Sequence, residues 1–396
     1  MTSEALPRPR PGSEAARLVD AAERTAPPGA TPLVLSGALA VLGIVCFVIG
    51  LMQDPVVTWG AVAANLLFWA GLAQGGVVVA ASLHLAEARW GRLIERFALA
   101  LGGFKPISVV IAAGLWFGRS RLFPWMGDRG LPPWLNSNAL VLRDAGGLLV
   151  MTLLSAAFAR ASIRRSAAAG PLAMAVTILF FPIFGILSVD LGMSPDLRYH
   201  STVYPVLYLS GCYYSTLAAT AISVALWRQG EVRAIIPPKR VLDLGNLLWG
   251  FAIFVGYLWW CEFLVHWMGN LPDEAGRHLH LWHDWPWRII AWGALACGVL
   301  VPSAALLSRG VKRSSAAGGL AGAVALAGIL LERLLDVLPA LPVERGVGAA
   351  VLTAGVCVGF AGMFAVCYLL ALRRTPLFPT EDPEFVKELA VKDVEV

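Results

Sequence analysis

The sequence predicts an all-α integral membrane protein with about ten transmembrane helices, and its composition gives the first reason. Hydrophobic residues make up 58% of the 396 residues and charged residues only 14%. That leaves too few polar side chains to cover a soluble globule of this size. The second reason is a succession of apolar stretches long enough to cross about 30 Å of hydrocarbon. The lipid bilayer is therefore the expected solvent of most of the chain.

The apolar stretches define the expected spans within one membrane domain, residues 33–371. In chain order they are 33–52, 58–83, 95–117, 139–159, 170–192, 203–227, 241–268, 285–308, 314–338 and 347–371. Residues 1–32 mix Pro, Arg and Glu without a continuous apolar core, so we expect a disordered tail rather than a cleaved signal peptide. Residues 372–396 are acidic, and we expect a solvated or partner-bound tail.

The basic residues predict the orientation of these spans. Most of the 31 Lys and Arg residues fall in the two tails and in the connections after the second, fourth, sixth and eighth spans. Cytoplasmic loops carry the excess of Lys and Arg in membrane proteins. Both termini are therefore expected in the cytoplasm.

Ionisable side chains inside the spans are the main functional signal, because each is costly in hydrocarbon. Glu262 and His266 are four residues apart, as are Glu332 and Asp336, so each pair shares a helix face. With cytoplasmic termini, both pairs lie in the outer part of the membrane, and Asp190 joins them there. We interpret the two pairs as the outer end of a proton route.

Lys105 and Asp243 are expected to continue this route inward. Lys105 lies beside Pro106 at a helix-breaking position, where freed backbone groups need new partners. A structural interpretation stands beside the functional one. Asp190, Asp243 and Asp336 lie near span ends, where they can cap helices or reach the interface. Lys105 and Glu262 are also compatible with buried ion pairs that fix helix register.

The connections and the cysteines point to partners rather than to a resident metal. Residues 118–138 and 269–284 are long and rich in Trp, Pro and His, which is typical of docking surfaces or of an aromatic interfacial belt. His278, His280 and His283 lack a carboxylate or cysteine frame beyond Asp284, so no metal site is expected. The six cysteines form no C-x-x-C motif, so neither a cysteine-ligated cluster nor a covalent haem is expected.

Several segments resemble one known family. They are N-L-L-F-W-A-G-L-A-Q-G-G (65–76), A-R-W-G-R (88–92), P-W-L-N (133–136), Y-H-S-T-V-Y (199–204), D-L-G-N-L-L-W (243–249) and W-M-G-N-L-P-D-E (267–274). In this order and spacing, the chain resembles the NrfD-like (polysulfide-reductase type) integral membrane subunits. The likeness is greatest to the smaller such subunit of alternative complex III, a quinol:cytochrome c oxidoreductase of the bacterial cytoplasmic membrane.

The resemblance implies two four-helix bundles, helices 2–5 and 6–9, flanked by helices 1 and 10. It implies no cofactor bound by this chain. Haem c and iron–sulfur clusters would reside in partners: a homologous larger membrane subunit, a periplasmic iron–sulfur subunit, and pentahaem and monohaem cytochromes. Menaquinol or ubiquinol would be the substrate of the complex. Glu262, His266 and Lys105 depart from the family pattern, so its proton path is not transferred residue by residue.

Two other functions remain open at this stage. The first is a quinone-binding anchor of another molybdopterin or iron–sulfur oxidoreductase, with a pocket near the outer ends of helices 2–5. Its polar candidates are Asn65, Gln74, Arg143 and Asp144. The second is a secondary transporter, whose usual marks are broken helices and internal repeats. Lys105-Pro106 is one break, but the sequence shows only a weak echo between the two halves, at 65–68 and 246–249.

Overall fold

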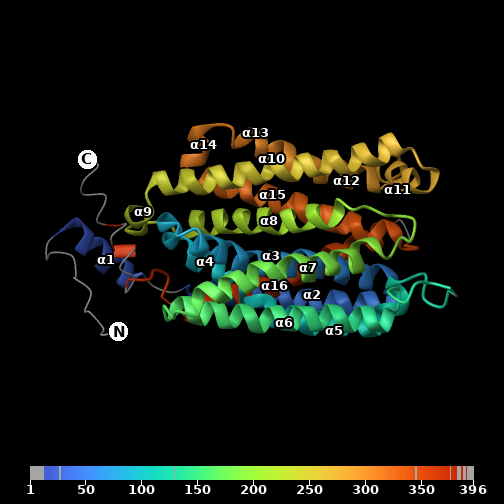
Figure 1. The fold of residues 1–396 in the computed structure, drawn as a ribbon, viewed down its shortest axis with the longest axis horizontal. Helices are drawn as coiled ribbons and strands as arrows, with labels where there is room; N and C mark the ends of the chain where they lie inside the picture. The colour runs from blue at the N-terminus through green and yellow to red at the C-terminus, as the bar shows by residue number, and fades with distance from the viewer. Residues whose placement is uncertain are drawn as a thin grey trace.

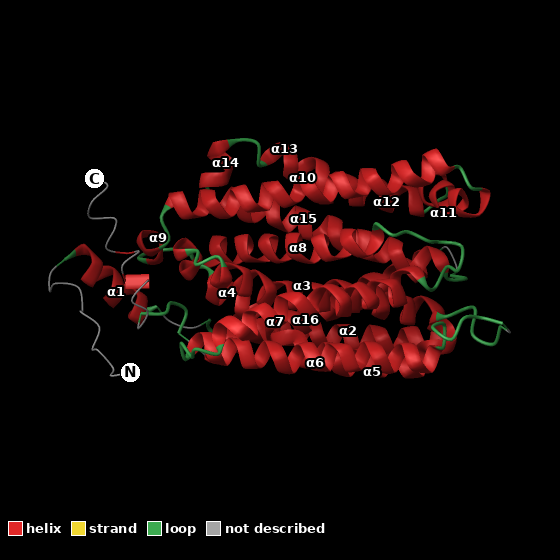
Figure 2. Ribbon diagram, viewed as in Figure 1, coloured by secondary structure: helices red, strands yellow, loops and turns green. Residues whose placement is uncertain are grey.

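The computed structural model describes residues 13–25, 28–128, 130–343, 346–374, 376–380, 385–386 and 389. Its long helices run side by side along one axis (Figure 1). Within the described residues the regular structure is helical (Figure 2). Nine described helical segments are long and apolar enough to cross a membrane. An all-α, multi-pass membrane protein is therefore confirmed.

The nine segments coincide with nine of the expected spans. They are α2 (Ala30–Gln53), α3 (Pro55–Leu85), α4 with α5 (Glu95–Leu122), α6 (Ser137–Ile163), α7 with a π-helical end (Ala169–Met193), α8 (Tyr204–Trp227), α10 (Pro238–Gly269), α12 with α13 (Trp287–Ala305) and α16 (Val347–Arg374). The remaining expected span corresponds to α15 (Ser315–Val337), which is not among the nine but packs lengthwise against α8 (Figure 1).

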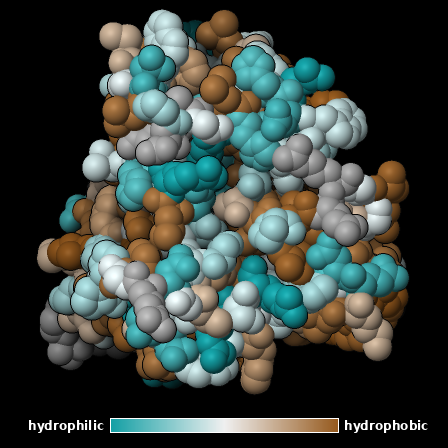
Figure 3. Space-filling view, turned by 90° about the vertical axis from the view of Figure 1, so that its right-hand side faces the viewer, coloured by the Kyte–Doolittle hydropathy of each residue, from teal (hydrophilic) through white to brown (hydrophobic). Residues whose placement is uncertain are grey.

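Short helices occupy the N-terminal tail and the connections between spans. They are α1 (Glu14–Arg24), α9 (Val232–Ile235), α11 (Pro272–His283) and α14 (Arg309–Arg313). Figure 3 looks onto the end of the bundle that carries α11, where hydrophilic side chains gather across the centre and hydrophobic ones along the margins. The expected docking loop 269–284 is therefore mostly helical.

The two tails differ in part from the disorder expected of them. Residues 14–24 form α1, because Ser13 caps its first turn and Ala15, Leu18 and Ala22 bury one face. In the C-tail, Phe378 and Phe385 are buried, and Phe378 packs edge-on against Phe97 of α4. The remainder of both tails, residues 1–12, 26–27, 375, 381–384, 387–388 and 390–396, lies outside the described residues.

The core of the bundle is built around α3 and α8. These are the two most buried of the nine spans, and side chains of α8 bond directly to the backbone of α3. Tyr208 donates to the Leu67 carbonyl at 2.9 Å, and Thr216 donates to the Leu72 carbonyl at 3.0 Å. α15 packs on both helices. Polar side chains of α8 therefore lie in the middle of the molecule.

Small residues allow the first and last spans to approach closely. A Cβ atom at Gly43 of α2 would lie 2.0 Å from the Cα of Gly359 in α16, and one at Gly362 would lie 2.4 Å from the Ala40 nitrogen. Such backbone contacts are typical of helix pairs in membranes. Arg373, at the end of α16, also donates to the Pro28 carbonyl just before α2 at 2.9 Å.

Two spans depart from regular α-helix at ionisable residues. A 3-10 turn at Gly102–Phe104 separates α4 (Glu95–Leu101) from α5 (Lys105–Leu122). The irregular turn thus lies just before Lys105 and Pro106, which both belong to the first turn of α5. In the second span, α7 (Ala169–Ser188) continues as a π-helix at Val189–Met193, which contains Asp190. Such irregular segments are frequent at functional sites.

Candidate functional site

Three carboxyl groups meet near the α11 end of the bundle, and an arginine of α15 lies between two of them. Arg333 contacts Glu332 at 2.9 Å and Asp336 at 2.7 Å. Arg333 is 1% exposed, so its guanidinium is buried in the bundle. Because Glu332 and Asp336 are four residues apart, one helix face presents both to the same guanidinium.

Glu262 of α10 contributes the third carboxyl group. It accepts a short hydrogen bond from the Tyr199 hydroxyl, and the Arg277 guanidinium lies over the Tyr199 ring at 4.2 Å. Arg277 also donates to the Leu335 carbonyl at 3.2 Å. On the neighbouring turn of α10, Trp259 donates to Glu332 at 2.7 Å. Side chains from α10, α11 and α15 are therefore joined in one network.

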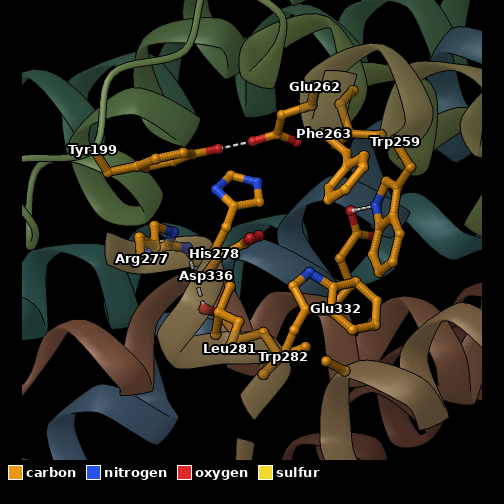
Figure 4. A pocket seen from close by; sticks show the side chains of 13 residues that line it. Tyr199, Trp259, Glu262, Phe263, Arg277, His278, Leu281, Trp282, Glu332 and Asp336 are labelled. Carbon is orange, nitrogen blue, oxygen red and sulfur yellow. Dashed lines mark hydrogen bonds between the residues drawn. The ribbon is translucent and has the colours of Figure 1, made fainter. Parts of the chain in front are cut away.

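The network encloses a cavity of about 80 Å³, large enough for more than one water molecule. Glu262, Glu332 and Asp336 all line it, together with Arg277 and Tyr199 (Figure 4). The figure shows the Tyr199 hydroxyl pointing at Glu262 on one side and Trp259 pointing at Glu332 on another. We call this the acidic cavity. It brings together three of the four residues expected at the outer end of the route.

Tyr199 lies outside the spans, and its environment is unusual for a tyrosine. Burial raises the pKa of its phenol well above 10.0, and the nearby Glu262 carboxylate raises that pKa further, against the opposing charge of Arg277. The phenol therefore remains a hydrogen-bond donor to Glu262 throughout the physiological pH range.

His266, the fourth expected residue, lies beside the acidic cavity rather than in its lining. One ring nitrogen contacts the Glu262 backbone carbonyl at 2.8 Å and the other lies 3.3 Å from the His200 carbonyl. Its ring stacks on Tyr199 and lies 4.6 Å from the His278 ring. The shared helix face was a sound expectation, but it joins His266 to the backbone of Glu262 and not to its carboxyl group.

Asp190 belongs to a second buried group at the outer ends of α6 and α7. Arg143 donates to it through two nitrogens, one at 2.5 Å, and stacks over Trp134 at 3.9 Å. Asp144 lies within hydrogen-bonding reach of Asp190. Asp144 is buried, with 5% of its surface exposed, and neither of its carboxylate oxygens forms a hydrogen bond with any other described residue. Asp190 is thus paired across helices rather than capping its own.

The other candidates have separate partners. Lys105 donates to Gln74 and Ser155 through short hydrogen bonds and to the Met151 carbonyl at 2.8 Å. Asn65 accepts from Trp69 at 3.1 Å and donates to the Cys357 sulfur at 3.2 Å. The four quinone-pocket candidates therefore occupy three places: Asn65 alone, Gln74 with Lys105, and Arg143 with Asp144.

Asp243, expected to continue the route inward, is bonded to its own helix. Arg240 lies 3.0 Å from its carboxylate, and the Asp243 side chain is 31% exposed. Because this pair is solvated and local, it fits the structural interpretation of an ion pair near a helix start. No recorded contact joins Asp243 to Lys105.

A polar stripe along α8 was not anticipated from the sequence. Its buried members recur at helical spacing: Tyr204, Tyr208, Cys212, Thr216, Thr220 and Ser223. At one end the Tyr208 ring lies under Arg333, 5.0 Å from the guanidinium carbon. At the other end Ser223 accepts a hydrogen bond from Tyr368 of α16 at 2.7 Å. A search for polar residues at four-residue intervals, rather than for charges alone, would have found it.

Comparisons with known proteins add no assignment. No protein-family model matches the chain, and no curated protein matches it significantly. Among the described residues, no group of three His, Cys, Asp or Glu side chains is arranged to hold a metal ion.

Proposed function

We propose that this chain is a proton-handling membrane subunit of a respiratory quinol:electron-acceptor oxidoreductase of the alternative complex III type. The proposal that the chain handles protons is supported by the excess of carboxyl groups over guanidinium groups around the acidic cavity. Glu262, Glu332 and Asp336 face two guanidinium groups, those of Arg277 and Arg333. The two arginines balance only two of the three carboxyl groups, and burial favours compensation of the third negative charge by a bound proton.

The part played in a respiratory complex rests on the family resemblance. In that arrangement the chain has ten spans in two four-helix bundles, with α15 as the ninth span, and both termini lie in the cytoplasm. It lies in the bacterial cytoplasmic membrane beside a larger homologous subunit. The outer face contacts iron–sulfur and cytochrome subunits, which carry the clusters and haems, while this chain binds none.

The α8 polar stripe supports an inward continuation of the proton route. Its outer members lie next to Arg333, and its inner member bonds to α16 near the opposite end. Hydroxyl and thiol groups both donate and accept hydrogen bonds, so a buried row of them along α8 is suited to passing protons from one group to the next. This stripe replaces Asp243 in the proposed route, because Asp243 is solvated and paired with Arg240.

A second function, direct quinol binding, is favoured by one observation. Asp144 is a buried carboxyl group with no recorded hydrogen-bond partner beyond its neighbour Asp190. A quinol hydroxyl is the kind of donor that such a group would accept. This alternative needs only the Arg143 group and not the acidic cavity, so substitutions distinguish the two proposals.

The first experiment is purification of the tagged chain from its own membranes in a mild detergent, followed by mass spectrometry and a visible spectrum. We expect co-purified multihaem cytochrome and iron–sulfur subunits. A colourless protein without redox partners would contradict the respiratory role and favour a transporter.

The second experiment tests proton handling in the purified complex. Glu262→Gln combined with Glu332→Gln should lower proton release coupled to quinol oxidation by about tenfold or more, because a proton relay of this kind contributes at least that factor. Arg198→Gln, an exposed outer residue, is the matched control. Unchanged proton release in the double variant would rule out a role of the acidic cavity in proton transfer. If quinol oxidation is lost only in Asp144→Asn, the result would instead support quinol binding beside Arg143.

A further inference from the structure

A cavity of about 340 Å³ lies where α4, α5, α6 and α16 meet, at the end of the bundle opposite the acidic cavity. Four cationic side chains line it, and its described lining includes no acidic residue. We call it the basic cavity; its cations are Arg96, Lys105, Arg160 and Arg374. Four positive charges around one cavity in a membrane protein require an explanation.

The three arginines stand at the ends of their helices. Arg96 is in the first turn of α4, Arg160 in the last turn of α6, and Arg374 is the last residue of α16. Arg160 and Arg374 are exposed. The rim of the basic cavity therefore lies at the level where helices leave the membrane, which is the level of lipid phosphates.

Lys105 and Ser155 form the floor. Ser155 precedes Arg160 by five residues on α6, which places it about 7–8 Å deeper along the helix axis. The Lys105 ammonium is 4% exposed and is held by three neutral acceptors, Gln74, Met151 and Ser155. None of these neutralises its charge, so an anion in the cavity would supply the missing counter-charge.

Among the described residues, the acid nearest in sequence does not fill this role. Glu95 pairs with Arg92 at 3.0 Å and accepts a hydrogen bond from Ser162 at 2.8 Å, so its charge is already compensated by another cation. Lys105, Arg160 and Arg374 line the basic cavity, and no described carboxylate forms an ion pair with these three. Their positive charges are therefore available to an anionic ligand.

The wall of the cavity continues into an apolar, exposed surface. Pro106 and Ile163 line the cavity and are exposed, and Val110 of α5 and Leu153 of α6 follow at 71% and 63% exposure. A free phosphate ion would bind the cations but would not cover this apolar surface. An amphiphile with an anionic headgroup would do both.

We propose that the basic cavity binds the phosphodiester headgroup of an anionic glycerophospholipid whose acyl chains lie along the exposed faces of α5 and α6. Arginine forks match phosphate oxygens in two-point hydrogen bonds, and basic pockets between transmembrane helices on the cytoplasmic side are suited to such headgroups. This proposal shares no residue with the acidic cavity or with the α8 polar stripe. It assigns Lys105, which the sequence placed on the proton route, to lipid binding instead.

The test uses the purified full-length chain after delipidation, with native mass spectrometry to count bound lipid on titration. Phosphatidylglycerol and cardiolipin are the anionic probes, phosphatidylcholine is the zwitterionic probe, and sodium phosphate is the competitor. We expect saturable binding of the anionic lipids, little binding of phosphatidylcholine, and no displacement by millimolar phosphate. Displacement by phosphate would overturn the lipid assignment in favour of a free-anion site.

Arg160→Gln with Arg374→Gln should weaken anionic lipid binding by about thirtyfold, because each surface cation contributes a factor of about five. Arg309→Gln with Arg313→Gln, two exposed residues of α14, is the matched control and should bind as the wild type does. An equal loss in both variants would mean nonspecific attraction and would overturn the proposal.

A second variant protects the test against misfolding. Ala159→Trp fills the basic cavity from its wall without changing any charge. It should abolish tight lipid binding while the unfolding temperature and the monodisperse elution are retained. Wild-type lipid binding by a folded Ala159→Trp variant would place the lipid elsewhere.

Discussion

Two buried cations, Lys105 and Arg333, have opposite surroundings. Lys105 is 4% exposed and Arg333 1% exposed, so both are withdrawn from solvent. Arg333 is held between two carboxylates of its own helix. Lys105 is held by an amide oxygen, a hydroxyl and a backbone carbonyl. The charge of Arg333 is therefore balanced by opposite charges inside the protein, whereas the charge of Lys105 is stabilised only by neutral polar groups.

Arg333 thus has all its charged partners within the protein, whereas Lys105 can receive one from a ligand. Arginine keeps its charge in every environment that proteins offer, so at least one of its two carboxylate partners, Glu332 or Asp336, must remain charged for the fold to be stable. Lys105 faces a cavity that opens beside exposed apolar surface, where a ligand can complete the balance. Removing each cation should therefore have effects of different size and kind.

The largest expected effect is that of Arg333→Met. It leaves two buried carboxylates without their cation, which should lower the free energy of unfolding by about 3–5 kcal/mol. Thermal unfolding in a mild detergent measures this. Arg198→Gln is the control, because its ion pair with Asp196 is exposed and its loss should change stability by less than about 0.5 kcal/mol. Wild-type stability of Arg333→Met would mean that the buried ion pairs do not hold α15 in place.

A smaller effect is expected for Lys105→Met. The change leaves three neutral acceptors without a donor, which should lower the free energy of unfolding by about 1–3 kcal/mol. The same unfolding assay ranks the two variants, with the exposed Arg313→Gln as control. If Lys105→Met proved more destabilising than Arg333→Met, the contrast between the two surroundings would be wrong.

The smallest effect concerns the pH dependence of Tyr199→Phe. The pKa of Tyr199 is raised well above 10.0 by burial and by Glu262, so the folded protein holds a proton that the unfolded chain releases at about pH 10. The stability that this proton contributes is complete below about pH 10 and declines as pH rises toward the folded pKa. Tyr199→Phe should make the alkaline decline shallower.

Unfolding temperatures from about pH 8 to about pH 11 measure this slope. Arg198→Gln is the control, because Arg198 is an exposed outer residue and arginine keeps its charge over this pH range. Equal alkaline slopes in the wild type and in Tyr199→Phe would mean that Tyr199 releases its proton at the same pH in both states.

Hydropathy predicted the spans closely, because apolar length is a property of single segments. The first expected span, 33–52, corresponds to α2 (Ala30–Gln53), and the last, 347–371, corresponds to α16 (Val347–Arg374). The break before Lys105 was also predictable, since Gly102, Gly103 and Pro106 disfavour helix locally.

Partners across helices were not predictable from one sequence. Spacing placed Glu332 and Asp336 on one face, but the sequence does not show that Trp259 bonds to Glu332 or that Tyr199 bonds to Glu262. Arg143 and Asp190 are 47 positions apart in sequence. Such pairs follow from the packing of the bundle, which depends on interfaces between helices and not on any one helix.

The close fit of α2 against α16 has a consequence for how the protein is made. Gly43 and Gly359 meet backbone to backbone, and Arg373 is bonded to Pro28. During synthesis α2 leaves the ribosome first of the long helices and has to wait in the membrane, without this neighbour, until α16 has been translated. A chain that ends before residue 347 thus leaves Gly43 of α2 without its partner and open to contact with the wrong helix.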